Sequence, residues 1–186
     1  MTVSVDRETL LVELVDDAGD AAGSCSVAEA HEAPGRLHRA FSVMLIDPDG
    51  RMLLQRRAAV KTRFALRWAN SCCGHPAPGQ DPLAAARDRM ADELGVDVDI
   101  ELRDIGAFVY QASDAATARV EYEWDHVLVG TVTDLALDPD PAEVAECGWV
   151  APADLKSAMD SDPDSYTPWL PPVLELLAGQ ASHHVG

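Results

Sequence analysis

Cysteine, long apolar runs and basic residues are all scarce in this chain of 186 residues. Of its four cysteines, Cys72 and Cys73 are adjacent, Cys25 and Cys147 are isolated, and none belongs to a C-x-x-C pair. This usage argues against a disulfide framework and against a structural zinc knuckle. No apolar run approaches the roughly 20 residues that span a bilayer, and the acidic residues 1–20 do not resemble a signal peptide. We therefore expect a cytoplasmic protein.

The 14 Lys and Arg residues are outnumbered by 32 Asp and Glu, which gives a formal net charge of −18. This charge argues against nucleic acid or an anionic membrane as a partner. An anionic substrate would need a local group of cations, and Arg56, Arg57 and Lys61 form one such cluster. The cluster is either the exposed end of a hairpin or an anion clamp, in which Arg makes bidentate phosphate contacts and Lys acts as a point charge.

The length of the chain and its apolar content of 47% are typical of one globular domain. We expect this single domain to occupy residues 1–186. Its core is predicted at about 36–178, with an N-terminal extension at 1–35 and a frayed tail at 179–186.

Turn and cap residues predict a strand at 37–46, a turn at 47–50 and a hairpin partner at 51–57. Asp81 as N-cap begins a helix that ends before Gly95. The core face of this helix is predicted to hold Leu83, Arg87, Met90 and Leu94. Further elements are expected as strands at 10–15, 105–112, 120–133 and 145–150, a loop or short helix at 22–35, and helices from 152 and at 171–178. Strands interspersed around one capped helix favour an α/β or α+β sandwich over a doubly wound parallel sheet.

Three carboxylates recur at alternate positions in the predicted strand 120–133. Glu121, Glu123 and Asp125 therefore share one face, where they repel one another unless they are solvated or meet a cation. A solvated sheet face is the ordinary explanation of such a pattern. Because Trp124 and Val127 indicate a central strand with neither face freely wet, a metal ion is favoured here.

A thiol and an imidazole lie close together in Asn70–Pro76. Cys73 and His75 flank Gly74, which permits close backbone approach, and Asn70 and Ser71 are placed to orient the segment by hydrogen bonds. Taken alone, the cysteine is equally well explained as a small buried hydrophobe. The other two early histidines, His31 and His38, are too far apart in sequence to form one compact ligand pair.

The predicted helix carries Arg89 and Glu93 one turn apart, the spacing of an ordinary surface ion pair. The same residues follow the spacing of the Nudix signature, a glycine-to-helix motif that places carboxylates over a metal–diphosphate. The match is degenerate, because Gln80 and Asp92 stand where the motif has Glu. Glu93 remains as a ligand for Mg²⁺ bridged to phosphate oxygens. The loss of the other carboxylates weakens the case for hydrolysis.

Over roughly residues 10–178 the chain resembles the type I isopentenyl-diphosphate isomerases, which have the Nudix fold. The resemblance rests on Ala30-His31, 36–42, Gln55-Arg56-Arg57, the Asn70–Pro76 block, Glu93-Leu94-Gly95, Glu121-Tyr122-Glu123 and Thr167-Pro168-Trp169. It implies a mixed β-sheet sandwiched between helices. It also implies interconversion of isopentenyl and dimethylallyl diphosphate, a step of isoprenoid biosynthesis that needs no nucleic acid and no membrane.

The resemblance further implies two bound ions. One divalent ion, Mn²⁺, Zn²⁺ or Mg²⁺, would be bound by His31, His38, His75, Glu121 and Glu123, a set of N and O ligands that does not choose among these metals. A second ion, Mg²⁺, would be held by Glu93, the substrate diphosphate and the backbone carbonyl of Cys73. The diphosphate itself would be contacted by Arg57, Lys61 and Arg89.

The catalytic groups implied by the resemblance are Cys73 and Glu123, with Tyr110 and Glu121 assisting. An unactivated alkene has no acidic proton, so the reaction must begin with protonation to a tertiary carbocation and end with loss of a neighbouring proton. An acid and a base on opposite faces of the alkene meet this need. The pocket must be dry, and Trp169 would cap it and stabilise the cation through its ring face.

One position departs from the family. Val27 stands where the family usually has Lys, so a cation is missing or is supplied by Arg36 or Arg39, and we expect weaker substrate binding. Two other functions stay open at the level of sequence. One is a Nudix diphosphohydrolase acting on a nucleotide, and the other is a metal-stabilised binding module without turnover.

Overall fold

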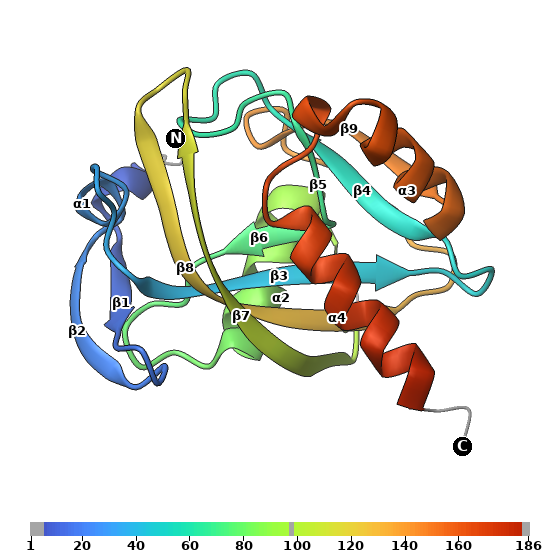
Figure 1. Cartoon of the computed structure of the whole chain (residues 1–186). Coiled ribbons are helices and arrows are strands. Elements are labelled where there is room, and N and C mark those ends of the chain that lie inside the picture. The colour runs from blue at the N-terminus through green and yellow to red at the C-terminus, as the bar shows by residue number, and fades with distance from the viewer. Residues whose placement is uncertain (1–5, 97–98, 184–186) are drawn as a thin grey trace.

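The structure is a computed structural model that describes residues 6–96 and 99–183. Within these ranges the strands form one mixed sheet (Figure 1). They are β1 (Leu11–Val15), β2 (Ala21–Ser26), β3 (His38–Ile46), β4 (Met52–Arg57), β5 (Trp68–Ala69), β6 (Cys72–Gly74), β7 (Leu102–Asp114), β8 (Arg119–Thr131) and β9 (Val144–Val150). The helices are α1 (Val27–Ala30), α2 (Pro82–Leu94), α3 (Pro152–Ser161) and α4 (Leu170–His183), with 3₁₀ turns η1 (Arg7–Thr9) and η2 (Pro163–Ser165).

Strand β3 is the centre of the sheet. It pairs in parallel with β8 from His38↔Glu123 to Ile46↔Thr131, and antiparallel with β6, where Ser42 lies opposite Cys73. Strand β7 then pairs antiparallel with β8 along most of its length. Segments far apart in the chain therefore lie side by side, and their polar side chains meet at one end of the sheet.

The predicted strand–turn–strand at 37–57 is confirmed, but the predicted hairpin pairing is largely wrong. The Asp47 side chain accepts hydrogen bonds from the backbone of Asp49 and Arg51, as expected of the turn. Strands β3 and β4 are nevertheless paired only at Ile46↔Met52. Both edges of β3 are occupied by β8 and β6, and β4 pairs with β9 and β5 instead. A local turn sets the direction of the chain but not the partner of a strand.

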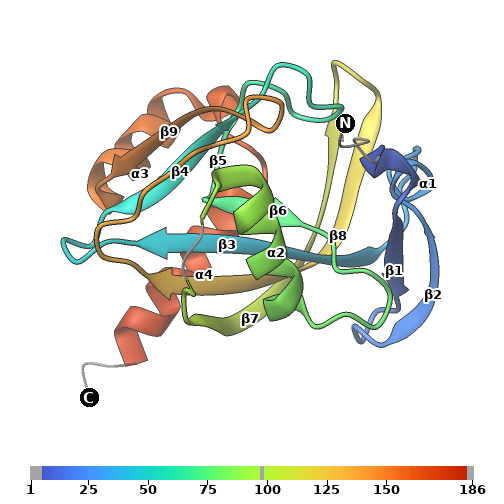
Figure 2. The ribbon, with the colours of Figure 1, turned by 180° about the vertical axis from the view of Figure 1, so that it is seen from behind.

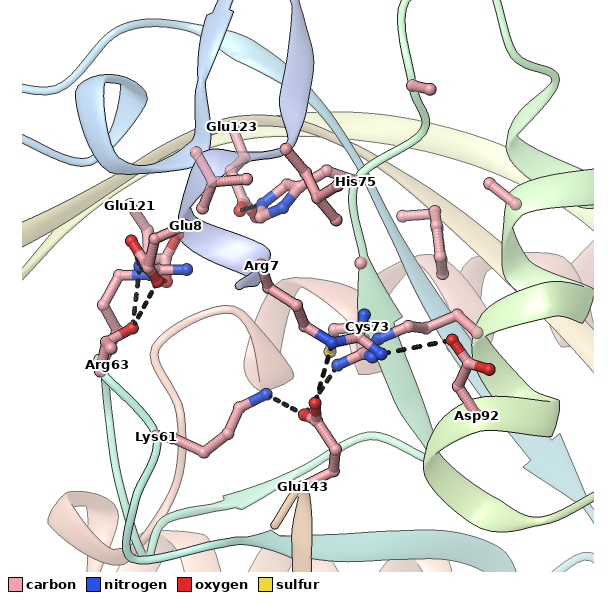
Figure 3. A pocket seen from close by; sticks show the side chains of 18 of the residues that line it. Arg7, Glu8, Lys61, Arg63, Cys73, His75, Asp92, Glu121, Glu123 and Glu143 are labelled. Carbon is pink, nitrogen blue, oxygen red and sulfur yellow. Dashed lines mark hydrogen bonds and ion pairs between the residues drawn. The ribbon is translucent and has the colours of Figure 1, made fainter. Parts of the chain in front are cut away.

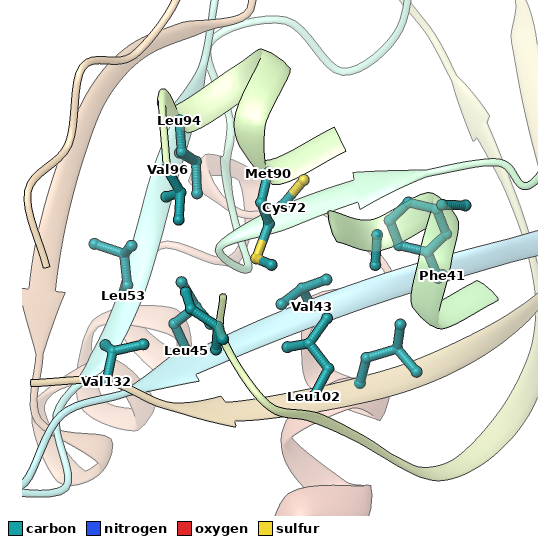
Figure 4. Packing of buried hydrophobic residues seen from close by; sticks show 14 of the residues in the cluster. Phe41, Val43, Leu45, Leu53, Cys72, Met90, Leu94, Val96, Leu102 and Val132 are labelled. Atoms are coloured by element: carbon teal, nitrogen blue, oxygen red, sulfur yellow. The ribbon is translucent and has the colours of Figure 1, made fainter. Parts of the chain in front are cut away.

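Helices cover both faces of the sheet. Helix α4 crosses in front of β3 in Figure 1, and α2 crosses in front of it in the reverse view of Figure 2. One hydrophobic cluster joins α2 to the sheet through residues such as Phe41, Leu45 and Met90 (Figure 4). A second cluster joins α3 and α4 to the other face through Met44, Leu155 and Leu170, among others. The predicted sandwich of a mixed sheet between helices is confirmed.

Helix α2 has the predicted caps, and its buried face differs from the predicted one in part. Asp81 accepts a hydrogen bond from the Leu83 backbone, and Gly95 ends the helix with φ +64°. The residues buried on it are Ala85, Ala86, Arg89, Met90, Glu93 and Leu94. Arg87, predicted on the core face, is exposed and lies 3.7 Å from the Asp99 carboxylate. The prediction is confirmed for Leu83, Met90 and Leu94, which pack in the core cluster, and is wrong for Arg87. Arg89 and Glu93 are buried in addition because they pair with each other.

The two ends of the chain differ in part from expectation. The segment 22–35 contains β2 as well as the short helix α1, which begins with a capping box between Ser26 and Glu29. At the other end α4 continues to His183, past the start of the predicted frayed tail, and residues 184–186 lie outside the described ranges. None of the described helices is long and apolar enough to cross a membrane.

The close approach at Gly95 yields a prediction about stability. A Cβ atom there would lie 2.4 Å from the Asp138 carbonyl oxygen, whereas at Gly50, with φ +78°, a Cβ would meet nothing within 4 Å. Gly50→Ala should therefore cost only the backbone strain, about 1 kcal/mol, and Gly95→Ala at least about 1 kcal/mol more in free energy of unfolding. Urea unfolding measures both, and equal losses would show that the contact with Asp138 imposes no constraint.

Candidate metal centre and active site

A cavity of about 610 Å³ opens between η1, the start of α2 and the ends of β6 and β8 (Figure 3). Its wall mixes apolar groups with cations, carboxylates, a thiol and an imidazole. The lining includes these polar or reactive residues: Arg7, Glu8, Arg57, Lys61, Arg63, Cys73, His75, Arg89, Tyr110, Glu121, Glu123, Glu143 and Trp169. Most of the predicted site residues are among them.

The five predicted ligands of the first ion lie together at one side of this cavity. One ligand atom from each of His31, His38, His75, Glu121 and Glu123 lies within 4.8 Å of all the others. His31 follows α1, His38 begins β3, His75 follows β6 and both carboxylates come from β8. Alternation along β8 points the two Glu side chains to the same face, and the parallel register sets His38 beside Glu123.

Backbone contacts orient two of the imidazoles. His31 Nδ1 lies 2.7 Å from the Val27 carbonyl oxygen, and His38 Nδ1 lies 2.7 Å from that of Arg36. A proton on each Nδ1 leaves the Nε2 atoms as acceptors that face the carboxylates, the arrangement in which histidines bind metals. Both Nε2 atoms and Glu121 Oε2 are buried, and each imidazole faces a carboxylate oxygen, at 2.7 Å for His31 and Glu121 Oε2 and 3.6 Å for His38 and Glu123 Oε1. A divalent cation would satisfy all three atoms, so these residues fit one.

The charge states of the cluster follow from its burial and its carboxylates. Burial lowers the pKa of His75 to about 4, against the pull of its hydrogen bond to Glu123. Burial also disfavours a charge on His31, but attraction by Glu121 outweighs it and raises that pKa to about 9. Burial raises the pKa of Glu123, yet the three imidazoles that surround its carboxylate bring the pKa well below the usual value. A metal ion would displace the His31 proton and meet a neutral His75 and an ionised Glu123.

One amide positions both the thiol and the indole predicted for the site. Cys73 Sγ donates to Asn70 Oδ1 at 3.1 Å, and Trp169 Nε1 donates to the same oxygen at 3.0 Å. The Asn70 side chain is held in turn by the Val43 and Cys72 carbonyls, at 3.1 and 2.8 Å. Burial raises the pKa of Cys73 to about 12, although the nearby Arg57 opposes the shift. The thiol therefore holds its proton.

The second predicted acid–base group lies on a different strand. Tyr110 donates to Glu123 Oε2 at 2.6 Å, and Glu123 Oε1 lies 2.9 Å from His75 Nε2. The aromatic rings of Tyr110 and Trp169 line the cavity beside them, 5.9 Å apart between centroids, and Phe64 packs against Trp169 from behind the lining at 5.5 Å. A thiol on β6 and a carboxylate on β8 thus line one cavity that has an apolar wall.

The predicted cations gather around a carboxylate that the sequence did not single out. Glu143, on the loop before β9, accepts from Lys61 Nζ at 2.5 Å and from Arg89 Nη2 at 2.8 Å. Burial raises its pKa, but attraction by Lys61 and Arg89 outweighs burial and lowers it to about 2. Arg57 instead lies over the Trp169 ring, 5.4 Å from its centroid, and donates to backbone carbonyls. Glu143 therefore ties the candidate phosphate-binding cations together.

Glu93, the predicted Mg²⁺ ligand, lies behind these cations. Its carboxylate pairs with Arg89 and accepts from Gln55 Nε2 at 3.0 Å. Glu93 is 3% exposed and is not part of the cavity lining. Coordination of an ion by Glu93 would replace its contact with Arg89.

Several other predicted side chains take different positions. Arg56 points away from the cavity and donates to the Leu66 carbonyl oxygen, since alternation along β4 sends Arg57 inward. Asp125 accepts from Ser42 at 2.8 Å and lies outside the His/Glu group. Burial and the Glu123 charge raise the pKa of Asp125 well above its usual value.

Arg63 is a site residue that sequence reasoning missed. Its Nε lies 3.1 Å from Glu121 Oε1, and its Nη1 lies 3.0 Å from Glu8 Oε1. It holds the one Glu121 oxygen that does not face His31. Its position two residues beyond Lys61 was the available signal, because it extends the basic cluster at 56–61. Glu143 had no such signal, since its role depends on cations that are distant in sequence.

Known proteins resemble this chain in sequence and in fold. The NUDIX domain family matches residues 36–170. An isopentenyl-diphosphate Delta-isomerase of Nocardia farcinica is 61% identical over 165 residues, 89% of this chain and 93% of that protein. One of Streptomyces coelicolor is 44% identical over 90% of this chain and 83% of that protein. The crystal structure of DR0079 from Deinococcus radiodurans superposes with a TM-score of 0.72 at 17% identity, over 89% of this chain and 98% of that one.

The fold and the family match define a protein of the NUDIX class, and its His/Glu cluster could bind a divalent cation. Within that class the chain belongs to the isopentenyl-diphosphate Delta-isomerase family, because its sequence similarity to members covers nearly the whole domain.

The contact between Arg63 and Glu121 yields a prediction about metal affinity. Arg63→Met removes the hydrogen bond that orients the carboxylate, so we expect divalent-metal affinity to fall about 10- to 100-fold. Arg67→Met is the matched control, because Arg67 lies over the Phe64 ring and donates to Tyr166. Calorimetric titration with Mn²⁺ measures both variants, and equal affinities would contradict a role for Arg63 in holding Glu121.

Proposed function

We propose that this chain converts isopentenyl diphosphate to dimethylallyl diphosphate by moving a proton on and off the carbon chain. The observation that carries the proposal is the placement of two proton-bearing groups on one cavity. The Cys73 thiol lines it from β6 and the Tyr110–Glu123 pair lines it from β7 and β8. The names of the Nocardia and Streptomyces relatives support the same reaction.

The diphosphate would bind at the cationic side of the cavity. Lys61 and Arg89 already hold the Glu143 carboxylate there, and Arg57 lines the same wall. Charge-assisted hydrogen bonds to phosphate oxygens use the same donors. The substrate diphosphate would also carry Mg²⁺, for which we propose Glu93 and the Cys73 carbonyl as the protein ligands.

The hydrocarbon end of the substrate would then lie against the aromatic wall. We propose that protonation of the terminal methylene gives a tertiary carbocation, and that loss of a proton from the neighbouring carbon gives the product. Cys73 serves one face of the alkene and Glu123, hydrogen-bonded to Tyr110, serves the other, with Glu121 assisting. Trp169 covers the reacting carbons, because water would quench the cation and an indole face stabilises positive charge.

The His/Glu cluster would hold the other divalent ion through His31, His38, His75, Glu121 and Glu123. A bound Mn²⁺, Zn²⁺ or Mg²⁺ supplies positive charge that keeps the two carboxylates ionised in a buried site. The imidazoles fix Glu123 in place, since its Oε1 atom lies 2.9 Å from His75 and 3.6 Å from His38. The carboxylate is thereby left in one orientation toward Tyr110 and the cavity.

The proposed chemistry also indicates the partners of the enzyme and its cellular compartment. The substrate is a small homoallylic or allylic diphosphate, and we propose that neither nucleic acid nor a membrane takes part. The four cysteines are all free thiols. Free thiols suit a reducing compartment, which supports the cytoplasm as its place of action.

Replacement of the catalytic thiol yields the first prediction about activity. Cys73→Ala should retain its divalent ions and lose turnover by about 10²- to 10⁴-fold, the usual contribution of a positioned acid–base group. Proton NMR of isopentenyl diphosphate with Mg²⁺ in D₂O measures it through dimethylallyl signals and deuterium incorporation. Cys72→Ala is the control, because the Cys72 side chain packs in the core cluster and should affect stability but not turnover. Full turnover by Cys73→Ala would rule out this role.

Removal of metal yields the second prediction about activity. Chelation should abolish turnover and lower the unfolding temperature, because an ion that binds only the folded cluster stabilises it. Added Mn²⁺, Zn²⁺ or Mg²⁺ should restore both, and His75→Gln should weaken the restoration of stability. Elemental analysis alongside the assay identifies the ion retained. A protein that is metal-free by analysis and still turns over at full rate would contradict the proposed site.

A further inference from the structure

Arg7 lies at the mouth of the cavity although it precedes the whole sheet in sequence. It begins the 3₁₀ turn η1 and its side chain lines the cavity wall (Figure 3). Its Nε lies 3.0 Å from Glu143 Oε1 and its Nη2 lies 3.2 Å from Asp92 Oδ2. A segment outside the NUDIX match therefore reaches the cationic side of the site.

Three cations from three parts of the chain meet on one carboxylate. Arg7 comes from η1, Lys61 from the loop after β4 and Arg89 from α2, and all three pair with Glu143. Side chains that converge on a carboxylate in this way also mark where the protein can hold a phosphate group. The donors and the charge-assisted hydrogen bonds are the same in both cases.

The turn that carries Arg7 is attached to the cavity wall on its other side. Glu8 Oε1 accepts from Arg63 Nη1 at 3.0 Å and from Thr62 Oγ1 at 2.9 Å. The Leu10 carbonyl accepts from the Val27 backbone at 2.8 Å. Arg7 is thus presented to the cavity by a segment with several fixed contacts.

The neighbouring wall supplies no other cation from the N-terminal region among the described residues. Val27 lines the cavity there with an apolar side chain. Arg39 is committed elsewhere, with Glu13 and the Gly19 carbonyl each at 2.7 Å, and neither it nor Arg36 lines the cavity. The expectation that Arg36 or Arg39 replaces a cation at position 27 thus finds no support in the geometry.

We propose that Arg7 is a diphosphate-binding residue, which donates to the substrate beside Lys61 and Arg89. The inference rests on the proposed function and adds a binding group to the same site. The Arg7 side chain is 41% exposed, so its ion pairs with Glu143 and Asp92 are weak and readily exchanged. A phosphate group can accept two parallel hydrogen bonds from the planar guanidinium, and it carries more negative charge than a carboxylate.

The test compares binding with turnover. Calorimetry with inorganic diphosphate and Mg²⁺ gives Kd, and the isomerisation assay gives KM and kcat. We expect Arg7→Gln to raise Kd and KM about tenfold, the loss of one charge-assisted hydrogen bond, and to leave kcat within about twofold. Arg7→Lys keeps the positive charge but lacks the planar guanidinium that makes a bidentate contact, so it should recover part of the lost affinity. Arg51→Gln is the control, because Arg51 pairs with Asp47 in the distant β3–β4 turn.

The Glu143→Gln variant distinguishes a direct contact between Arg7 and the diphosphate from an indirect effect in which Arg7 only neutralises the charge of Glu143. If Arg7 contacts the diphosphate, the tenfold loss persists when Arg7→Gln is made in Glu143→Gln. An unchanged Kd in Arg7→Gln, or a loss that vanishes in the Glu143→Gln background, would overturn the proposal. A wild-type protein that binds diphosphate but leaves isopentenyl diphosphate unchanged would refute the proposed function instead. Thermal unfolding establishes whether each variant is folded. If Arg7→Gln is unfolded, Kd and KM of Arg7→Lys are compared with those of the wild type instead.

Discussion

The parallel pairing of β3 with β8 is the constraint on which the site depends. Its register sets His38 beside Glu123 and runs unbroken to Ile46↔Thr131. A slip by one residue would turn Glu121 and Glu123 to the opposite face and separate them from the histidines. Because β6 pairs with the other edge of β3, the same strand also brings Cys73 to the cavity. Core strands that pack on two helical layers thus hold the candidate catalytic groups in register.

Charge is the second organising feature. The chain carries −18 overall, yet it gathers Arg7, Lys61 and Arg89 around one cavity. Each of these cations is paired with a carboxylate of the protein itself. A buried or half-buried cation without a partner would be costly, so the carboxylates stabilise the folded protein by pairing with these cations. An anionic substrate bound as proposed would compete with Glu143 for donors that are already in place, which would reduce the cost of ordering them.

The chemical groups of the site were easier to predict from the sequence than their positions in the fold. The Asn70–Pro76 block and Glu121 and Glu123 named the reactive groups, and the structure brings them to one cavity. The caps of α2 were predictable because they depend on a few adjacent residues. The apolar part of its buried face was predictable too, but the burial of Arg89 and Glu93 was not, since these residues are buried by pairing with each other. Arg63 escaped notice for the same reason, because its importance lies in a contact with Glu121.

The sequence by itself determined the kinds of groups present, the turns and helix caps, and the family resemblance, because these depend on residue type and short spacings. Only the tertiary structure decided that β4 leaves β3 after one residue pair, that Glu143 gathers three cations, and that Arg7 reaches the cavity. Each of these is a choice among partners distant in the chain. Such choices are made by the packing of the whole sheet and its helices, which no local pattern records.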